Sequence, residues 1–185
     1  MDKSLSFKER LLFANQYEIL SRLANDKYEK EQYENLRDIF SSGYSRYYSF
    51  ATEHFSDEVS DEECKFVIDV LNLYRDLYYS REHSEEAQNL IEEENVLFKG
   101  FDLNDSLEVK YFSFYKFLVE QLGRYGEIKE LMDSGKIEDY NSHGFGPSMD
   151  RLTKMISKRN EILERDKYHR HDDLTIKEIN EILNV

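Results

Sequence analysis

The segment at residues 141–152, NSHGFGPSMDRL, holds residue types that could bind a small ligand. His143 could pair with an anion, and the free backbone amides of the helix expected after Ser148 could donate hydrogen bonds to it. The same pattern, two glycines followed by the chain's only proline, is equally typical of a plain connection between two helices. GFGP lacks the lysine and hydroxyl residue of a phosphate-binding loop and follows no predicted strand. The connection is favoured, and the anion site stays open as an alternative.

Metal-binding patterns are sparse. HRHDD is the one local cluster of metal-ligand residue types, and it falls in an expected exposed linker near residues 166–174. Its members are His169, His171, Asp172 and Asp173. Neither an H-E-x-x-H nor a C-x-x-C motif is present. We therefore predict no metal site and no cofactor.

Nucleophilic chemistry has little support. The single cysteine, Cys64, follows Asp61, Glu62 and Glu63, whose negative charges oppose formation of a thiolate. A structural thiol, buried or half-buried, is the better interpretation. No serine or cysteine stands in a recognised nucleophile motif. An enzyme is therefore less favoured than a binding protein.

Two polar side chains fall inside apolar stripes of expected helices. Gln16 lies in the middle of a broad face formed by Leu12, Phe13, Tyr17, Ile19, Leu20, Leu23 and Ala24. Arg159 lies among the apolar residues of the helix after Ser148. A buried polar group needs a partner, because leaving it unpaired costs about 1–3 kcal/mol or more. A structural hydrogen bond or salt bridge is favoured, and a polar pocket between helices is the alternative.

Helical spacing of apolar residues recurs along the whole chain, and no run shows the alternation of a strand. Ser6 with Glu9, Ser60 with Glu63, Asp105 with Glu108 and Thr175 with Glu178 are candidate capping boxes. The sequence predicts an all-α fold, a single compact multi-helix domain over residues 1–185. A central hydrophobic helix is expected near residues 106–122. Further helices are expected near 7–24, 27–40, 61–79, 84–97, 149–163 and 176–183.

The charge is strongly acidic and unevenly spread. With 39 acidic and 25 basic residues, the net charge is −14, which repels nucleic acids and anionic lipids. Residues 148–171 reverse the sign and could contact phosphates. The same residues could instead pair with the protein's own acidic helices, within one chain or between subunits. Self-pairing is favoured, so nucleic-acid binding through 148–171 is the runner-up.

Composition also bears on compartment and assembly. A lone cysteine is typical of a reducing compartment, and no segment resembles a signal peptide or a membrane span. We therefore expect a cytoplasmic protein that makes no membrane contact. Fourteen tyrosines and twelve phenylalanines favour wet aromatic interfaces, as in a homo-oligomer or a complex with another protein. Tyr44, Tyr47 and Tyr48 are candidate interface residues.

An ordered set of segments resembles the YfbU family of bacterial proteins. They are RLLFANQYEIL, GYSRYY, FKGFD, YFSFYKFLVEQLGRY, HGFGPSMDRLTKM and EINEILN, and they span roughly residues 7–184. The resemblance implies an all-helical, cytoplasmic protein and carries no reaction or catalytic residue. Segments 80–95 and 126–141 depart from the family pattern, so we expect them to be surface additions.

These observations lead to one hypothesis for a site. We expect Gln16, Tyr17, Arg124, Tyr125 and His143 to converge on one polar patch beside the central helix, with Arg159 as a further binding residue. The leading function is an oligomeric interaction or regulatory module. The alternatives are nucleic-acid binding through residues 148–171 and a small-anion binder or enzyme around His143.

Overall fold

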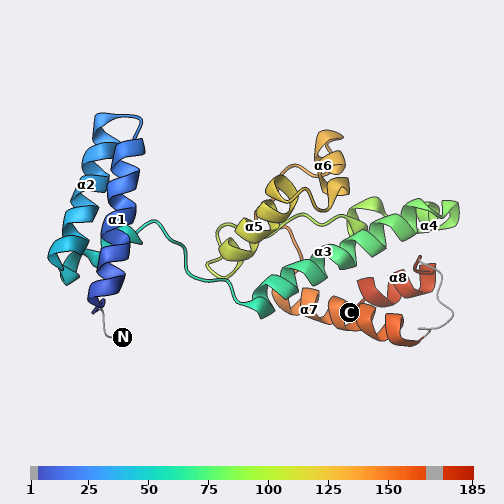
Figure 1. Ribbon diagram of the computed structural model, residues 1–185. Helices are drawn as coiled ribbons and strands as arrows, with labels where there is room; N and C mark the ends of the chain where they lie inside the picture. The colour runs from blue at the N-terminus through green and yellow to red at the C-terminus, as the bar shows by residue number, and fades with distance from the viewer. Residues whose placement is uncertain (1–3, 166–172) are drawn as a thin grey trace. The chain divides into compact units, whose positions relative to one another are not determined.

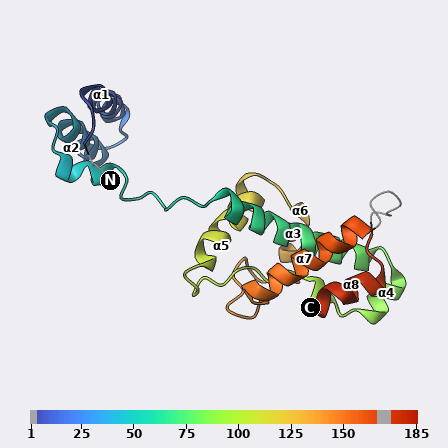
Figure 2. The same cartoon turned by 90° about the horizontal axis from the view of Figure 1, so that it is seen from below.

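The computed structural model describes residues 4–165 and 173–185, and within them helices account for nearly all regular structure. This confirms the all-α prediction. The chain divides into two compact units, one ending at Glu58 and the other starting at Val59. Figures 1 and 2 show the helices of each unit. That both units belong to one domain, as the sequence suggested, stays a prediction.

The first unit is a helical hairpin. Helix α1 (Phe7–Leu23) and helix α2 (Lys27–Ser42) lie side by side, and a 3₁₀ turn (Ser45–Ala51) follows. The Ser6–Glu9 capping box forms as predicted, because each side chain accepts a hydrogen bond from the other's backbone amide. Gly43 ends α2 in the left-handed conformation, with φ 75°.

The second unit is built around α3 (Asp61–Glu82), whose Ser60–Glu63 capping box is also formed. Its buried face carries Val67, Val70, Leu73 and Leu77. Against α3 pack α4 (Glu85–Leu90), a 3₁₀ turn (Glu93–Val96), α5 (Glu108–Lys116) and α7 (Met149–Arg165). Helix α6 (Gly126–Asp133) and helix α8 (Ile176–Leu183) complete the unit.

The predicted hydrophobic helix near 106–122 is α5 continued by a π-helical turn (Phe117–Gln121). Tyr115, Leu118 and Val119 are fully buried in the core of the second unit. The expected Asp105–Glu108 capping box is wrong in one detail. Asp105 accepts the amides that open the helix, but the Glu108 carboxylate accepts from the amide of Asp102.

The two segments expected to be surface additions contribute to the core instead. Ala87 and Ile91 in the first segment are buried, and so are Leu131 and Tyr140 in the second, which contains the unpredicted α6. The expected exposed linker near 166–174 lies mostly outside the described residues. At its end, Leu174 is buried and its amide donates to Ser80 Oγ at 2.7 Å.

A close backbone crossing joins residues 100–103 to 140–143. The Phe101 amide donates to Tyr140 O (3.1 Å), and the Ser142 amide donates to Phe101 O (3.0 Å). Asn141 Oδ1 accepts from the amides of Leu103 and His143. The crossing therefore places the GFD and HGF motifs side by side. None of the helices in the described ranges combines the length and apolar character that crossing a membrane requires.

We predict that Gly100→Ala destabilises the protein by about 3 kcal/mol or more. Gly100 has φ 95°, and a Cβ there would lie 1.8 Å from Tyr140 O, a backbone atom that cannot turn away. Urea unfolding followed by circular dichroism measures the loss. Gly126→Ala is the matched control: a Cβ there meets no atom within 4 Å, and its φ is not positive. We expect that change to be neutral or to stabilise α6 by up to about 1 kcal/mol. Equal losses in the two variants would contradict the role of the crossing.

Candidate functional site

Helix α1 carries apolar side chains on two faces, and α2 covers one of them. On the covered face, the Phe13 and Tyr17 rings lie 5.0 and 5.7 Å from the ring of Phe40. Burial in the hairpin is slight, because Phe40, Ala14 and Ser21 are its only fully buried side chains among residues 4–58. The hairpin therefore has little core of its own.

The second apolar face of α1 is open. Leu12, Ile19 and Leu23 are 64%, 58% and 70% exposed. Together with Gln16 they occupy positions i, i+4, i+7 and i+11, the spacing of a helix that packs along another helix. We call these four residues the outer stripe. Its apolar members are the sort of exposed patch that marks a protein interface.

The sequence placed Leu12, Ile19 and Leu23 on the same broad face as Phe13 and Tyr17. In the structure that face is split, since α2 covers only one side of it. The width of the face was a clue, because seven apolar residues spread around a helix are more than one neighbouring helix can cover. The outer stripe was therefore missed as a separate surface.

Gln16, the polar member of the outer stripe, is exposed. It lines an open groove of about 660 Å³ together with Tyr17, Tyr48 and Phe55. Tyr48 stacks on Phe40 at 5.1 Å, and partial burial raises the pKa of Tyr17. The groove is lined mainly by apolar side chains, and Gln16 borders both this groove and the outer stripe.

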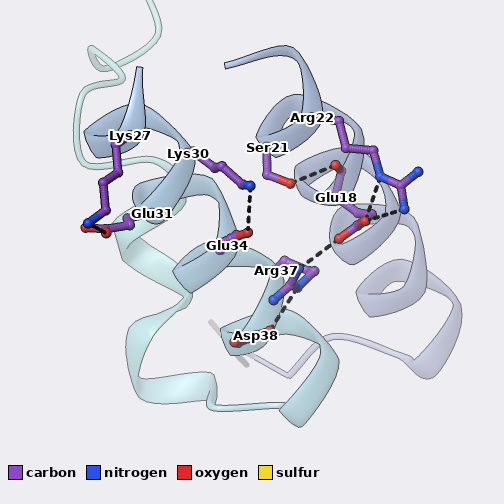
Figure 3. Close-up of polar contacts among 9 residues, drawn as sticks. All are labelled: Glu18, Ser21, Arg22, Lys27, Lys30, Glu31, Glu34, Arg37 and Asp38. Carbon is purple, nitrogen blue, oxygen red and sulfur yellow. Dashed lines mark hydrogen bonds and ion pairs between the residues drawn. The ribbon is translucent and has the colours of Figure 1, made fainter. Parts of the chain in front are cut away.

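An ionic contact joins the two helices away from the outer stripe (Figure 3). Arg37 of α2 donates from Nη1 to Glu18 Oε2 at 2.8 Å, and Arg22 Nε donates to Glu18 Oε1 at 2.8 Å. The hydrogen bond from Arg37 is the largest cause that lowers the pKa of Glu18 from its ordinary value of 4.5, and the hydrogen bond from Arg22 lowers it further. Glu18 and Arg22 lie on another face of α1, and none of the four residues of the outer stripe is charged.

Two of the predicted site residues, Arg124 and Tyr125, lie just after the π-helical turn of the second unit. Tyr125 has φ 54° and is buried, and its hydroxyl donates to Asn72 Oδ1 at 3.0 Å. The Arg75 guanidinium lies 4.4 Å above its ring and also binds the Glu127 carboxylate with two hydrogen bonds. Burial raises the pKa of Tyr125. This arrangement ties α6 to α3 and leaves the exposed side chain of Arg124 outside it.

His143 and Arg159 have different surroundings from Tyr125. His143 is exposed with φ 49°, and its Nδ1 lies 3.2 Å from Asn141 Nδ2. It lines an open hollow of about 490 Å³. Arg159 pairs with Asp76 Oδ2 through Nε (2.7 Å) and Nη2 (2.6 Å), which joins α7 to α3 as a structural salt bridge.

The residues of the hypothetical shared patch are divided between the two units. Gln16 and Tyr17 belong to the first unit, and the other four residues belong to the second. Within the second unit, Tyr125, His143 and Arg159 each contact different neighbours. Convergence of Gln16, Tyr17, Arg124, Tyr125 and His143 on one patch therefore stays a prediction.

The basic helix α7 pairs with its own unit. Its five basic residues all have partners: Arg151 with Leu183 O, Lys154 with Asp150, Lys158 with Glu161, Arg159 with Asp76, and Arg165 with Glu161 and Glu181. The remaining basic residues of the 148–171 segment lie beyond the described part. Self-pairing therefore describes α7 as far as the structure extends.

Residue types with metal or thiol chemistry are scattered. Within residues 4–165 and 173–185, no three His, Cys, Asp or Glu side chains gather closely enough to hold a metal ion. Of the HRHDD cluster, only Asp173 is described, and it binds His83 Nδ1 at 3.1 Å. Cys64 is half-buried. Burial raises the pKa of its thiol, and the negative charges of Asp61 and Glu63 raise it further.

We predict that Glu18→Gln reduces the acid sensitivity of the protein. Because the folded pKa of Glu18 is lowered, its contribution to stability is full above pH 4.5 and is lost as the pH falls through the lowered value. Melting temperatures measured between pH 7 and pH 3 should fall less steeply in the variant. Glu34→Gln, which removes a longer 3.9 Å contact within α2, is the control and should follow the unmodified protein. Identical pH profiles for all three proteins would contradict this role of Glu18.

Comparison with known proteins agrees with the resemblance seen in the sequence. The family described as the YfbU domain matches residues 3–185, which span both units. The UPF0304 protein MJECS11 of Methanocaldococcus jannaschii is 33% identical over 182 residues, covering 97% of this chain and 99% of that protein. Since that relative is archaeal, the family is not restricted to bacteria, and a bacterial source for this chain stays a prediction. The chain belongs to the YfbU family.

Proposed function

We propose that the protein is a self-associating interaction module in which the α1–α2 hairpins of two copies pack together as a four-helix bundle. The outer stripe carries this proposal. It is an apolar, heptad-spaced surface on a hairpin that has only three fully buried side chains among its described residues.

The hairpin gains stability if a further helical layer covers it. Two short helices with little buried surface are marginal in water, because packing supplies most of the stability of helices in proteins. Burying the exposed part of each of Leu12, Ile19 and Leu23 contributes roughly 1–2 kcal/mol. An additional pair of helices is the usual solution for such a face, as in four-helix bundles.

A second copy fits this surface for two reasons. An isologous interface brings a residue near the two-fold axis against its own equivalent, and Gln16 is self-complementary because its amide both donates and accepts. Residues 1–58 also hold eleven acidic and eight basic side chains, so this unit is nearly neutral within a chain of net charge −14. Like-charge repulsion is therefore weakest at the hairpin.

The runner-up, nucleic-acid binding through 148–171, has less support. Four of the five basic residues of α7 pair with carboxylates inside the second unit, and Arg151 donates to the backbone carbonyl of Leu183. A cytoplasmic location remains part of the proposal and rests on the lone cysteine, which is partly buried. No reaction is proposed for the protein.

We predict that Gln16→Glu weakens self-association at neutral pH. The substitution keeps the side-chain shape but places two like charges near the two-fold axis, and partial burial increases their repulsion. We expect a loss of affinity of about tenfold or more, measured by sedimentation equilibrium. Gln16→Leu should have the opposite effect, since it removes a polar group from the apolar interface.

Asn15→Asp is the matched control, because it makes the same change in charge one residue away, off the outer stripe. It should leave the association constant within about threefold of the unmodified protein, as expected for a charge at the rim. A protein that stays monomeric at all concentrations would contradict the proposal. Equal effects of Gln16→Glu and Asn15→Asp would contradict the placement of Gln16 in the interface.

A further inference from the structure

A polar pocket of about 390 Å³ lies in the second unit, between the start of α7, the end of α8 and residues 94–99. Its deep side is formed by Tyr74, Leu97 and Met155, which are buried. Three exposed asparagines, Asn95, Asn180 and Asn184, stand on its rim. The volume is in the range of pockets that bind small molecules, and the lining combines apolar walls with a few polar groups.

Tyr74 is a largely buried tyrosine in the wall of this pocket. It is 7% exposed, and its ring packs against Phe98 at 5.1 Å. The hydroxyl oxygen of Tyr74 is not sealed from solvent, because the one enclosed side-chain oxygen or nitrogen without a partner in the described residues is Tyr115 Oη. Burial raises the pKa of Tyr74 to about 12, opposed only by the charge of Arg151. Tyr74 and Arg151 both line the pocket.

The charged groups around the pocket favour an anion. The Arg151 guanidinium donates one hydrogen bond to Leu183 O (2.8 Å), which fixes its position. Its other N–H groups remain available to a ligand. Lys99 adds a second cation and is only loosely paired with Glu94, at 3.7 Å. Two cations against one carboxylate give a local positive charge in a chain that is otherwise strongly acidic.

We propose that this pocket binds a small organic acid, with its carboxylate between the Tyr74 hydroxyl and the Arg151 guanidinium. The body of the acid then packs against Leu97, Met155 and Leu183, and the rim asparagines bind its polar substituents. A charged acceptor forms a stronger hydrogen bond with the Tyr74 hydroxyl than a neutral one does. This site lies wholly within the second unit and does not depend on self-association. It adjoins the hollow that His143 lines, since Glu94, Leu97, Lys99 and Phe145 border both.

The test is an NMR titration of the full chain with sodium benzoate at constant ionic strength. We expect saturable shifts of the side-chain amide signals of Asn95, Asn180 and Asn184, and none with sodium chloride. Inorganic phosphate is titrated in parallel. Tighter binding of phosphate than of benzoate would overturn the assignment to carboxylates. Absence of saturable shifts at about 10 mM benzoate, ten times a weak millimolar Kd, would overturn the site itself.

Tyr74→Phe removes the hydroxyl and keeps the ring, so the fold should be retained. We expect benzoate to bind about tenfold more weakly, the effect of losing one hydrogen bond to a charged group. Tyr78→Phe, on the same helix but outside this pocket, should leave affinity unchanged. Lys99→Gln, on the exposed rim, should weaken binding several-fold without affecting folding. Unchanged affinity in Tyr74→Phe, or equal losses in Tyr74→Phe and Tyr78→Phe, would contradict the proposal.

Discussion

The contact between α1 and α2 covers only one side of α1, and this limits what the first unit can do alone. Phe13 and Tyr17 pack on Phe40, and the Glu18–Arg37 ion pair fixes the two helices beside each other. Neither contact reaches the outer stripe. Since the hydrophobic effect scales with the apolar area removed from water, the uncovered leucines and isoleucine are an unused source of stability in the hairpin. The proposed self-association follows from that imbalance.

The second unit is different, because its core is closed. Helix α3 buries one apolar face along its length, and α5 and α7 cover it. The crossing of residues 100–103 with 140–143 then fixes two loops whose backbone would otherwise be free. The pocket containing Tyr74 and Arg151 lies next to this crossing, on elements held by many contacts. Preorganised groups of this kind suit ligand binding, since little order is lost when the ligand enters.

Local rules predicted much of the fold. The capping boxes at Ser6, Ser60 and Thr175 all form, because each depends on residues three positions apart. The box at Asp105 does not form as predicted, because the tertiary fold brings the amide of Asp102 within reach of Glu108. Helix α6 was missed for a similar reason. Its buried residues are few, and its place in the core is decided by the Arg75–Glu127 contact with α3.

The candidate sites show the same limit. Gln16 was identified from its position among apolar residues. Its place in the outer stripe could not be predicted, because that requires knowing which face of α1 is covered by α2. Arg159 was also noticed, and its partner Asp76, 83 positions away in the chain, makes it a structural residue. Tyr74 was not singled out, since a helical pattern cannot show which side chains line a pocket. Periodicity identifies which residues face inward, whereas pairing across helices depends on the complete fold.

Hydrogen–deuterium exchange of the full chain, measured at protein concentrations about a hundredfold apart, tests the central claim most directly. Self-association through the outer stripe predicts that the amides of α1 exchange more slowly at the higher concentration, because binding stabilises the folded hairpin. The amides of α3 should change much less, since the core of the second unit is closed. Exchange of α1 that is the same at both concentrations would contradict the account.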